Sequence, residues 1–319
     1  EDVTAVAGGL DEASADAIGA AAEAGGRLFL NVGAPDDALR GARCRRHAFH
    51  VEASAGMYAD ALARWLAGEQ GLARWIFVDG HAGGGAAYAR ARTALLAQGG
   101  EDAARLAVTD SASAAAALSA IARSSAQVAL VLLRGEERVE FLRRYRDADL
   151  APALACLFPP DVSISAIPAQ SRLGLWPVLW HPGLFRYGAE QLSDRFQDRF
   201  AEPPDSRAWT AWMAAKILAE GALRARSVDG PALVAYLEGR RAQFDGHKGL
   251  SLTFRPWDHQ LRQPVYLVRA RREGAAAREA FEHVAELPLG DVPPATSSRD
   301  FLDRLGDGPE QTACRFPGA

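Results

Sequence analysis

Short apolar runs alternate with amphipathic stretches along the first half of the chain, and Gly or Pro clusters mark many of the junctions. The pattern predicts strands over 3–8, 28–32, 50–52, 75–78, 105–108, 128–133 and 153–158. It predicts helices over 11–24, 111–123 and 136–145, and two more that start at residue 54 and after the loop 79–85. Strands that alternate with helices favour βαβ units, so the pattern predicts an α/β fold with parallel sheets.

The second half of the chain has a different pattern. Long helices are predicted over about 187–200, 205–225 and 231–240, followed by a hairpin of 250–254 with 264–268. The tail from about residue 287 is rich in Pro, Gly, Ser and Asp, which predicts a wrapping or loose segment.

Composition restricts the class of protein. The chain has 319 residues, of which 49% are hydrophobic, so one large domain or two ordinary ones can form a core. A net charge of −4 argues against a general nucleic-acid binder, and no apolar run is long enough to span a bilayer. The three cysteines, Cys44, Cys156 and Cys314, are too widely spaced for a zinc or CxxC motif. One disulfide with a buried thiol would suit an exported protein, and three reduced thiols a cytosolic one.

Candidate binding residues follow the predicted strands, because ligands of open α/β sheets gather at the carboxyl ends of strands. This rule indicates the loops 33–37, 81–85 and 134–136. The glycine-rich loop matches neither GxGxxG nor GxxxxGK[ST], so a ligand at backbone N–H groups is favoured over a nucleotide. The ligand residues predicted in these loops are Ala34, Pro35, Asp36, His81, Gly83, Gly84 and Arg134.

Two further clusters combine aromatic residues with turns. One contains Arg255, Trp257 and Arg262, and the other, at 176–183, contains Trp176, Trp180 and His181. Arginine forks and indole faces suit an anionic, planar ligand. The alternative is that both clusters are surface turns with aromatic plugs.

No catalytic constellation is visible. The sequence has no GxSxG, no cysteine in a catalytic context and no HExxH or paired-ligand histidine spacing. We therefore predict a non-enzymatic protein with neither a metal site nor a resident cofactor.

Several segments carry a family resemblance. They are 30–40 (LNVGAPDDALR) with Cys44 and His50, 180–182 (WHP), 254–264 (FRPWDHQLRQP) and 314–316 (CRF). In these the chain resembles type I periplasmic solute-binding proteins, the branched-chain amino acid-type receptors of ABC transporters. Within that family it resembles the branch associated with catabolism that depends on pyrroloquinoline quinone (PQQ). The resemblance covers residues from about 3 to 316.

The resemblance implies two parallel-sheet lobes joined by hinge crossings, with the ligand closed between them. We expect 1–50 plus about 171–319 to form the first lobe, with the C-terminal hairpin and tail, and about 54–170 to form the second. Members usually have further βα units before the first strand seen here, so the first lobe is expected to lack them. We also expect a periplasmic location, a disulfide between Cys44 and Cys314, and a buried free thiol at Cys156.

The expected function is that of a monomeric periplasmic protein that delivers a small anionic solute to an ABC permease. PQQ, which is planar and carries three carboxylates, is the first candidate ligand, and a related carboxylate is the second. The alternatives are an accessory protein that docks a periplasmic quinoprotein dehydrogenase or supplies its cofactor, and an amino-acid receptor. Trp176, Trp180 and His181 are expected near the crossing, whereas Arg255 and Trp257 would face either the ligand or the hinge.

Overall fold

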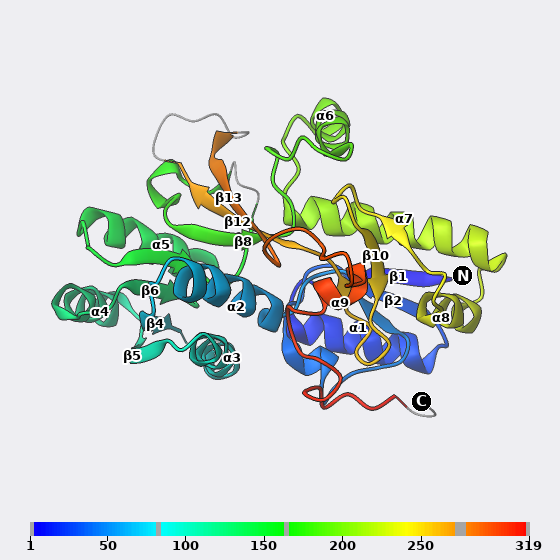
Figure 1. Ribbon diagram of the computed structural model, residues 1–319, viewed down its shortest axis with the longest axis horizontal. Coiled ribbons are helices and arrows are strands. Elements are labelled where there is room, and N and C mark those ends of the chain that lie inside the picture. The colour runs from blue at the N-terminus through cyan, green and yellow to red at the C-terminus, as the bar shows by residue number, and fades with distance from the viewer. Residues whose placement is uncertain (1–2, 81–83, 163–165, 272–278, 317–319) are drawn as a thin grey trace.

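The computed structural model describes residues 3–80, 84–162, 166–271 and 279–316. Its strands form three sheets. The elements gather into two lobes that lie side by side along the longest axis of the molecule (Figure 1). The chain therefore has the two-lobe α/β fold that the sequence predicted.

The first lobe is built on a three-stranded parallel sheet of β1 (Ala5–Gly8), β2 (Leu28–Asn31) and β3 (Ala48–His50), in that order. Helix α1 (Glu12–Ala24) begins at Asp11, whose carboxylate accepts a hydrogen bond from the Ser14 amide. The long helix α7 (Ser206–Ala225) contacts β1, and α8 (Gly230–Glu238) contacts β2. A small antiparallel sheet of β9 (Phe244–Asp245), β10 (Ser251–Phe254) and β11 (Leu261–Arg262) lies beside these elements (Figure 1).

The second lobe is built on a seven-stranded sheet with the order β13-β12-β8-β7-β6-β4-β5. Five of its strands run parallel to one another: β4 (Arg74–Asp79), β5 (Glu101–Ala107), β6 (Val128–Val131), β7 (Ala153–Cys156) and β8 (Leu175–Val178). The sheet is completed by β12 (Val265–Ala270), which pairs antiparallel with β8, and by β13 (Phe281–Leu287), which pairs antiparallel with β12. Successive side chains of β4 enter different cores, because a strand directs its side chains to alternate faces: Phe77 packs into one and Val78 into the other. Both faces of the sheet are therefore buried.

Helices cover this sheet and connect the lobes. They are α2 (Ala55–Ala63), which continues as a π-helix over Arg64–Glu69, α3 (Gly84–Ala97), α4 (Ser111–Arg123) and α5 (Gly135–Asp147). Helix α6 (Ala189–Phe200) projects beside the junction of the lobes, and the short α9 (Ser298–Leu302) lies near that junction (Figure 1). Short 3-10 helices span Asp37–Arg40 and Ala169–Ser171. No helix in the described ranges has the length and apolar character needed to cross a membrane.

The predicted hairpin of 250–254 with 264–268 is wrong. Strand β10 pairs with β11 and β9, whereas β12 pairs with β8 and β13. The reversal is tighter than expected because the Arg255 amide donates to the Gln260 carbonyl, at 2.9 Å, and closes the turn at once. The chain then crosses to the other lobe at Gln263 and Pro264 before β12 begins (Figure 1).

The expected boundary at about residue 171 does not follow the strand pairing. Strands β8, β12 and β13 come from the range assigned to the first lobe, but they belong to the sheet of β4 to β7. The apolar segments that form β8 and β12 extend an existing hydrophobic sheet, which buries them on both faces. Strand β8 contains Pro177, a residue type that is uncommon within sheets, so the segment reads as a turn in the sequence.

The C-terminal tail is fastened to the first lobe. Cys44 and Cys314, the pair predicted from the sequence, form a disulfide with an Sγ–Sγ distance of 1.98 Å, and Cys156 is a buried free thiol. Near the disulfide, the Thr312 hydroxyl donates to the Arg40 carbonyl at 3.1 Å, and Phe316 stacks on His259. The tail therefore wraps the lobe.

Replacing both Cys44 and Cys314 by serine is expected to lower the free energy of unfolding by roughly 2–4 kcal/mol, because the bridge closes a very long loop of the unfolded chain. Urea denaturation of the oxidised protein and of the double variant measures the loss. Reductant should reproduce the loss in the wild type and leave the variant unchanged. Equal stability of the two proteins would mean that the tail is held by its other contacts alone.

Candidate functional site: the cleft between the lobes

Loops from both lobes meet in a narrow cleft at the carboxyl ends of the parallel strands. The space between them is about 20 Å³, which is room for about one water molecule. Gly33 and Pro35 follow β2, Glu52 follows β3, Arg134 follows β6, and Phe158 follows β7. The remaining lining residues are Leu10, Pro159, Pro160, Asp161, Ser206 and Arg207.

Asn31, the last residue of β2, fixes the loop that follows. Its Oδ1 accepts from the amides of Gly33, at 3.2 Å, and Ala34, at 2.9 Å, while Nδ2 donates to the Ala34 carbonyl at 2.8 Å. Both backbone groups of Ala34 are thereby occupied and the residue is fully buried. The loop therefore presents Gly33 and Pro35 to the cleft and keeps Ala34 behind them.

Arg40 ties the cleft loops to the hinge. This guanidinium is buried, and it donates to the carbonyls of Ala34, at 3.0 Å, and Glu52, at 2.7 Å. Its Nε donates to Gln260 Oε1 at 2.6 Å, and the Gln260 amide in turn donates to the Glu52 carbonyl at 3.0 Å. Nη1 also donates to the Asp36 carbonyl at 3.1 Å, so four of the five N–H donors are used and the buried Arg40 positions the cleft loops.

Glu52 is the buried acid of the cleft, with 3% of its surface exposed. Burial raises the pKa of its carboxyl from 4.5 to about 7, against the opposing effects of a hydrogen bond from the Tyr58 hydroxyl and the charges of Arg40, Arg207 and Arg134. The same burial and the neighbouring acid raise the pKa of Tyr58. Glu52 is therefore largely protonated below neutral pH.

Two arginines reach the cleft from opposite lobes. Arg134 precedes α5 in the second lobe and lies 3.9 Å above the Phe158 ring, and Arg207 stands in the first turn of α7 in the first lobe. Within the described residues, neither guanidinium makes a hydrogen bond or an ion pair. The start of α7 is held in place because the Leu179 amide donates to Ser206 Oγ at 2.9 Å and Thr210 donates to the Val32 carbonyl at 2.7 Å. The cleft is therefore prepared for an anion that both arginines can bind.

The neighbouring acid, Asp161, is already paired. Its Oδ2 accepts from Arg138 Nη2 at 2.7 Å and from the Gly135 amide at 2.6 Å. Asp161 therefore does not neutralise Arg134 or Arg207.

The structure brings together only some of the predicted loop residues. Pro35 and Arg134 line the cleft from its two sides. Asp36 does not line it, and one of its carboxylate oxygens, Oδ2, is buried without a hydrogen-bond partner. Gly84 begins α3, whereas His81 and Gly83 lie outside the described residues.

The cluster of Trp176, Trp180 and His181 is buried away from the cleft lining. Trp176 packs in the core of the second lobe beneath the Arg138 guanidinium, and Trp180 stacks on Trp209 with 6.3 Å between ring centroids. His181 Nε2 lies 3.1 Å from His283 Nδ1, and burial lowers the pKa of His181 to about 3. Trp180 packs in the core that joins the lobes and His181 contacts β13 of the second lobe, and none of the three residues lines the cleft.

The Arg255 turn holds the C-terminal tail. Arg255 is 1% exposed and its Nε donates to Asp303 Oδ1 at 2.8 Å. Arg262 Nε donates to the same carboxylate at 2.9 Å. The Trp257 indole donates to the Asp307 carbonyl at 3.2 Å, and both guanidiniums lie over its ring. Of the two orientations considered for Arg255 and Trp257, the structure shows them bracing the tail beside the hinge.

Sequence reasoning missed Glu52, Phe158 and Arg207. Glu52 and Phe158 are each the last residue of a predicted strand, so the rule that ligands gather at the carboxyl ends of strands could also have selected them. Arg207 follows the helix start at Asp205, whose carboxylate accepts from the Ala208 amide at 2.9 Å. That start is visible in the sequence, but its position in the cleft depends on contacts with Val32 and Leu179.

No group of three or more His, Cys, Asp or Glu side chains that could hold a metal ion occurs in the described ranges.

Glu52 should make stability depend on pH. Its pKa is higher in the folded protein than in the unfolded chain, so the unfolded chain loses this proton first as the pH rises. The contribution of Glu52 therefore falls between pH 4.5 and about 7. Glu52→Gln, which keeps an acceptor for Tyr58, should be more stable than the wild type by about 2–3 kcal/mol at pH 8, and by much less at pH 5. Urea denaturation at both pH values tests this, with the exposed Glu69→Gln as control; a pH-independent difference would contradict it.

Two α/β lobes with a polar cleft at the ends of their strands define a two-lobed solute-binding protein. The sequence model of the family described as "Periplasmic binding protein" matches residues 1–275. The chain therefore belongs to the periplasmic binding protein family. A comparison with curated proteins finds no match.

Solved structures share this fold. A branched-chain amino acid ABC transporter periplasmic ligand-binding protein from Burkholderia xenovorans superposes with a TM-score of 0.80 at 17% identity, over 88% of this chain and 76% of that one. A solute-binding protein from R. palustris, solved in complex with benzoate, gives 0.72 at 16% identity, over 94% and 77%. Another from Rhodopseudomonas palustris, solved with 3,4-dihydroxybenzoic acid, gives 0.73 at 14% identity, over 89% and 78%.

Proposed function

We propose that this protein binds a small anionic solute, a carboxylate, in the cleft between its lobes and delivers it to an ABC permease in the periplasm. The observation that carries the proposal is the pair Arg134 and Arg207, which reach the same cleft from opposite lobes without a hydrogen bond or ion pair to any described residue. A carboxylate bound by both guanidiniums would bridge the lobes. Such a ligand favours the closed state because both contacts exist only there.

An aromatic carboxylate suits the other walls of the cleft. Phe158 offers a ring beneath Arg134, and Pro35 and Pro159 add apolar surface. PQQ, planar and with three carboxylates, remains the first candidate, on chemical grounds and on the family branch that the sequence resembles. A benzoate-type carboxylate is the second, supported by the ligands of the two similar R. palustris proteins. Either ligand requires the lobes to open first, because the closed cleft holds only about 20 Å³.

A thermal-shift screen of PQQ, benzoate, 3,4-dihydroxybenzoate, short aliphatic carboxylates and amino acids tests the proposal. A cleft ligand at a hundred times its Kd should add roughly 2.7 kcal/mol of stability in the wild type, and much less in Arg134→Ala. If only amino acids act, and Arg134→Ala abolishes their effect, the protein is an amino-acid receptor. If no solute acts and the protein instead retains a quinoprotein dehydrogenase in a pulldown, the accessory role replaces solute delivery.

A further inference from the structure

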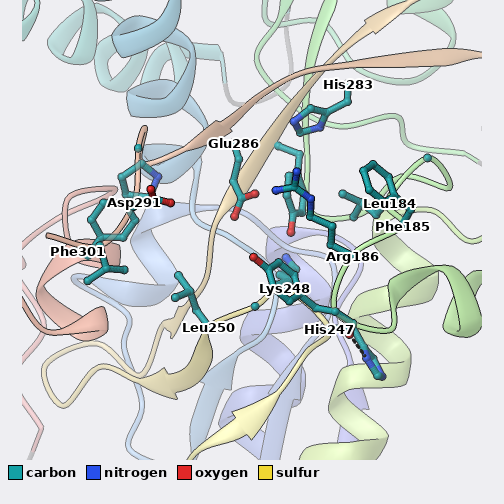
Figure 2. A pocket seen from close by; sticks show the side chains of 17 residues that line it. Leu184, Phe185, Arg186, His247, Lys248, Leu250, His283, Glu286, Asp291 and Phe301 are labelled. Atoms are coloured by element: carbon teal, nitrogen blue, oxygen red, sulfur yellow. Dashed lines mark hydrogen bonds between the residues drawn. The ribbon is translucent and has the colours of Figure 1, made fainter. Parts of the chain in front are cut away.

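A second, larger cavity lies at the junction of the lobes and shares no described lining residue with the cleft. Its volume is about 400 Å³, within the range of small-molecule sites. It is open to solvent and is lined by the loop that leads into α6, the segment before β10, and strands β12 and β13 with the chain that follows (Figure 2).

Two charges of opposite sign face this cavity without being paired. Arg186 comes from the loop before α6, and Glu286 from β13. In the part of the chain that the structure describes, neither side chain makes a hydrogen bond or an ion pair. Figure 2 shows Glu286 and Asp291 on one side of the cavity and Arg186 on the other. The charges of Lys248 and Arg186 act on Glu286, but no ion pair forms, so a molecule that carries both charges could bind between Arg186 and Glu286.

Lys248 forms one buried wall of the cavity, and burial lowers the pKa of its ammonium group well below the usual range, against the opposing charges of Glu286 and Glu52. It is 2% exposed and lies 3.8 Å above the Trp209 ring, with its Nζ donating to Gln263 Oε1 at 3.0 Å and to the Pro264 carbonyl at 3.4 Å. Both acceptors are neutral, and Glu286 and Glu52 act on the amine through their charges without forming an ion pair with Nζ. A carboxylate bound near Arg186 and Lys248 would favour the charged form of this amine.

The remaining walls suit an apolar body. Leu184, Leu250 and Phe301 also line the cavity, on different sides of the charged groups (Figure 2), and the Tyr266 ring adds an aromatic face. A ligand that lay with its carboxylate toward Arg186 and its ammonium toward Glu286 would place its apolar part against these side chains (Figure 2).

We propose that this cavity is a second binding site, which takes a small zwitterion composed of an ammonium group, a carboxylate and an apolar body. The site is separate from the cleft and does not depend on the function proposed for the cleft. Its occupant touches β12 and β13 of the second lobe on one side and the segment before β10 in the first lobe on the other.

Titration calorimetry with three compounds that share a phenyl body tests the proposal. They are L-phenylalanine, 3-phenylpropionate, which lacks the ammonium, and phenethylamine, which lacks the carboxylate. We expect L-phenylalanine to bind at least about tenfold more tightly than either of the others. Arg186→Gln and Glu286→Gln should each weaken its binding by about tenfold, whereas Glu282→Gln, an exposed change on the same strand outside the cavity, should not. Both charged residues are exposed, so these variants should fold normally.

Several results would overturn the second site. They are similar affinities for the three compounds, no binding of L-phenylalanine at about 10 mM, and unchanged affinity in both charge variants. Arg134→Ala separates this site from the cleft. If that variant abolishes the binding of L-phenylalanine while Arg186→Gln does not weaken it, the zwitterion belongs to the cleft. If Arg134→Ala leaves the affinity unchanged and the two charge variants weaken it, the second site stands whatever ligand the cleft binds.

Discussion

Replacing Arg255 by alanine is expected to destabilise the protein by about 3–5 kcal/mol without weakening ligand binding in the cleft. The side chain is buried, and its guanidinium pairs with Asp303 at 2.8 Å and lies 3.7 Å from Asp258. It also donates to the Leu305 carbonyl. The truncation would remove the guanidinium that Asp303, Asp258 and the Leu305 carbonyl contact, in a buried site where water cannot replace it.

Urea denaturation and ligand titration of Arg255→Ala measure the two effects separately. Arg304→Ala is the matched control, because that exposed arginine lies on the same tail segment and should change stability by no more than about 0.5 kcal/mol. If Arg255→Ala lost ligand affinity while keeping its stability, the turn would face the ligand, the other orientation considered from the sequence.

Local pattern predicted the elements of the fold well. Apolar runs such as Val128 to Val131 form buried strands, and helix starts such as Asp11 and Asp205 cap helices as their residue types predict. Pairing between distant segments could not be predicted from pattern. The sequence pattern pairs 264–268 with the nearby segment 250–254, whereas β12 pairs with β8, which lies far away in the sequence and contains a proline.

The candidate site was only partly predictable, for the same reason. Arg134 was found because it directly follows a strand. Arg255 and Trp257 have the chemistry of a ligand clamp, but their partners Asp303 and Asp307 come from the distant tail. The roles of these arginines are therefore decided by which residues the fold places beside them. Arg255 forms an ion pair with Asp303, whereas Arg134 and Arg207 act on the Glu52 carboxylate through their charges and form no ion pair with a described residue.

Truncating both cleft arginines should have the largest effect on binding. A charge-assisted hydrogen bond contributes about 1.5–3 kcal/mol, so Arg134→Ala and Arg207→Ala should each weaken a carboxylate ligand by about that amount. The double variant should lose roughly a thousandfold in affinity, because the two guanidiniums bind from opposite lobes. Arg195→Ala, an exposed change on α6, controls for the loss of positive charge.

Titration calorimetry of the wild type and the Arg134→Ala/Arg207→Ala double variant, with PQQ and 3,4-dihydroxybenzoate as probes, tests the anion-binding cleft most directly. We expect the wild type to bind at least one probe with one-to-one stoichiometry. The double variant should bind that probe roughly a thousandfold more weakly, with its unfolding transition unchanged. A double variant that is folded and binds the probe as tightly as the wild type does would contradict the account.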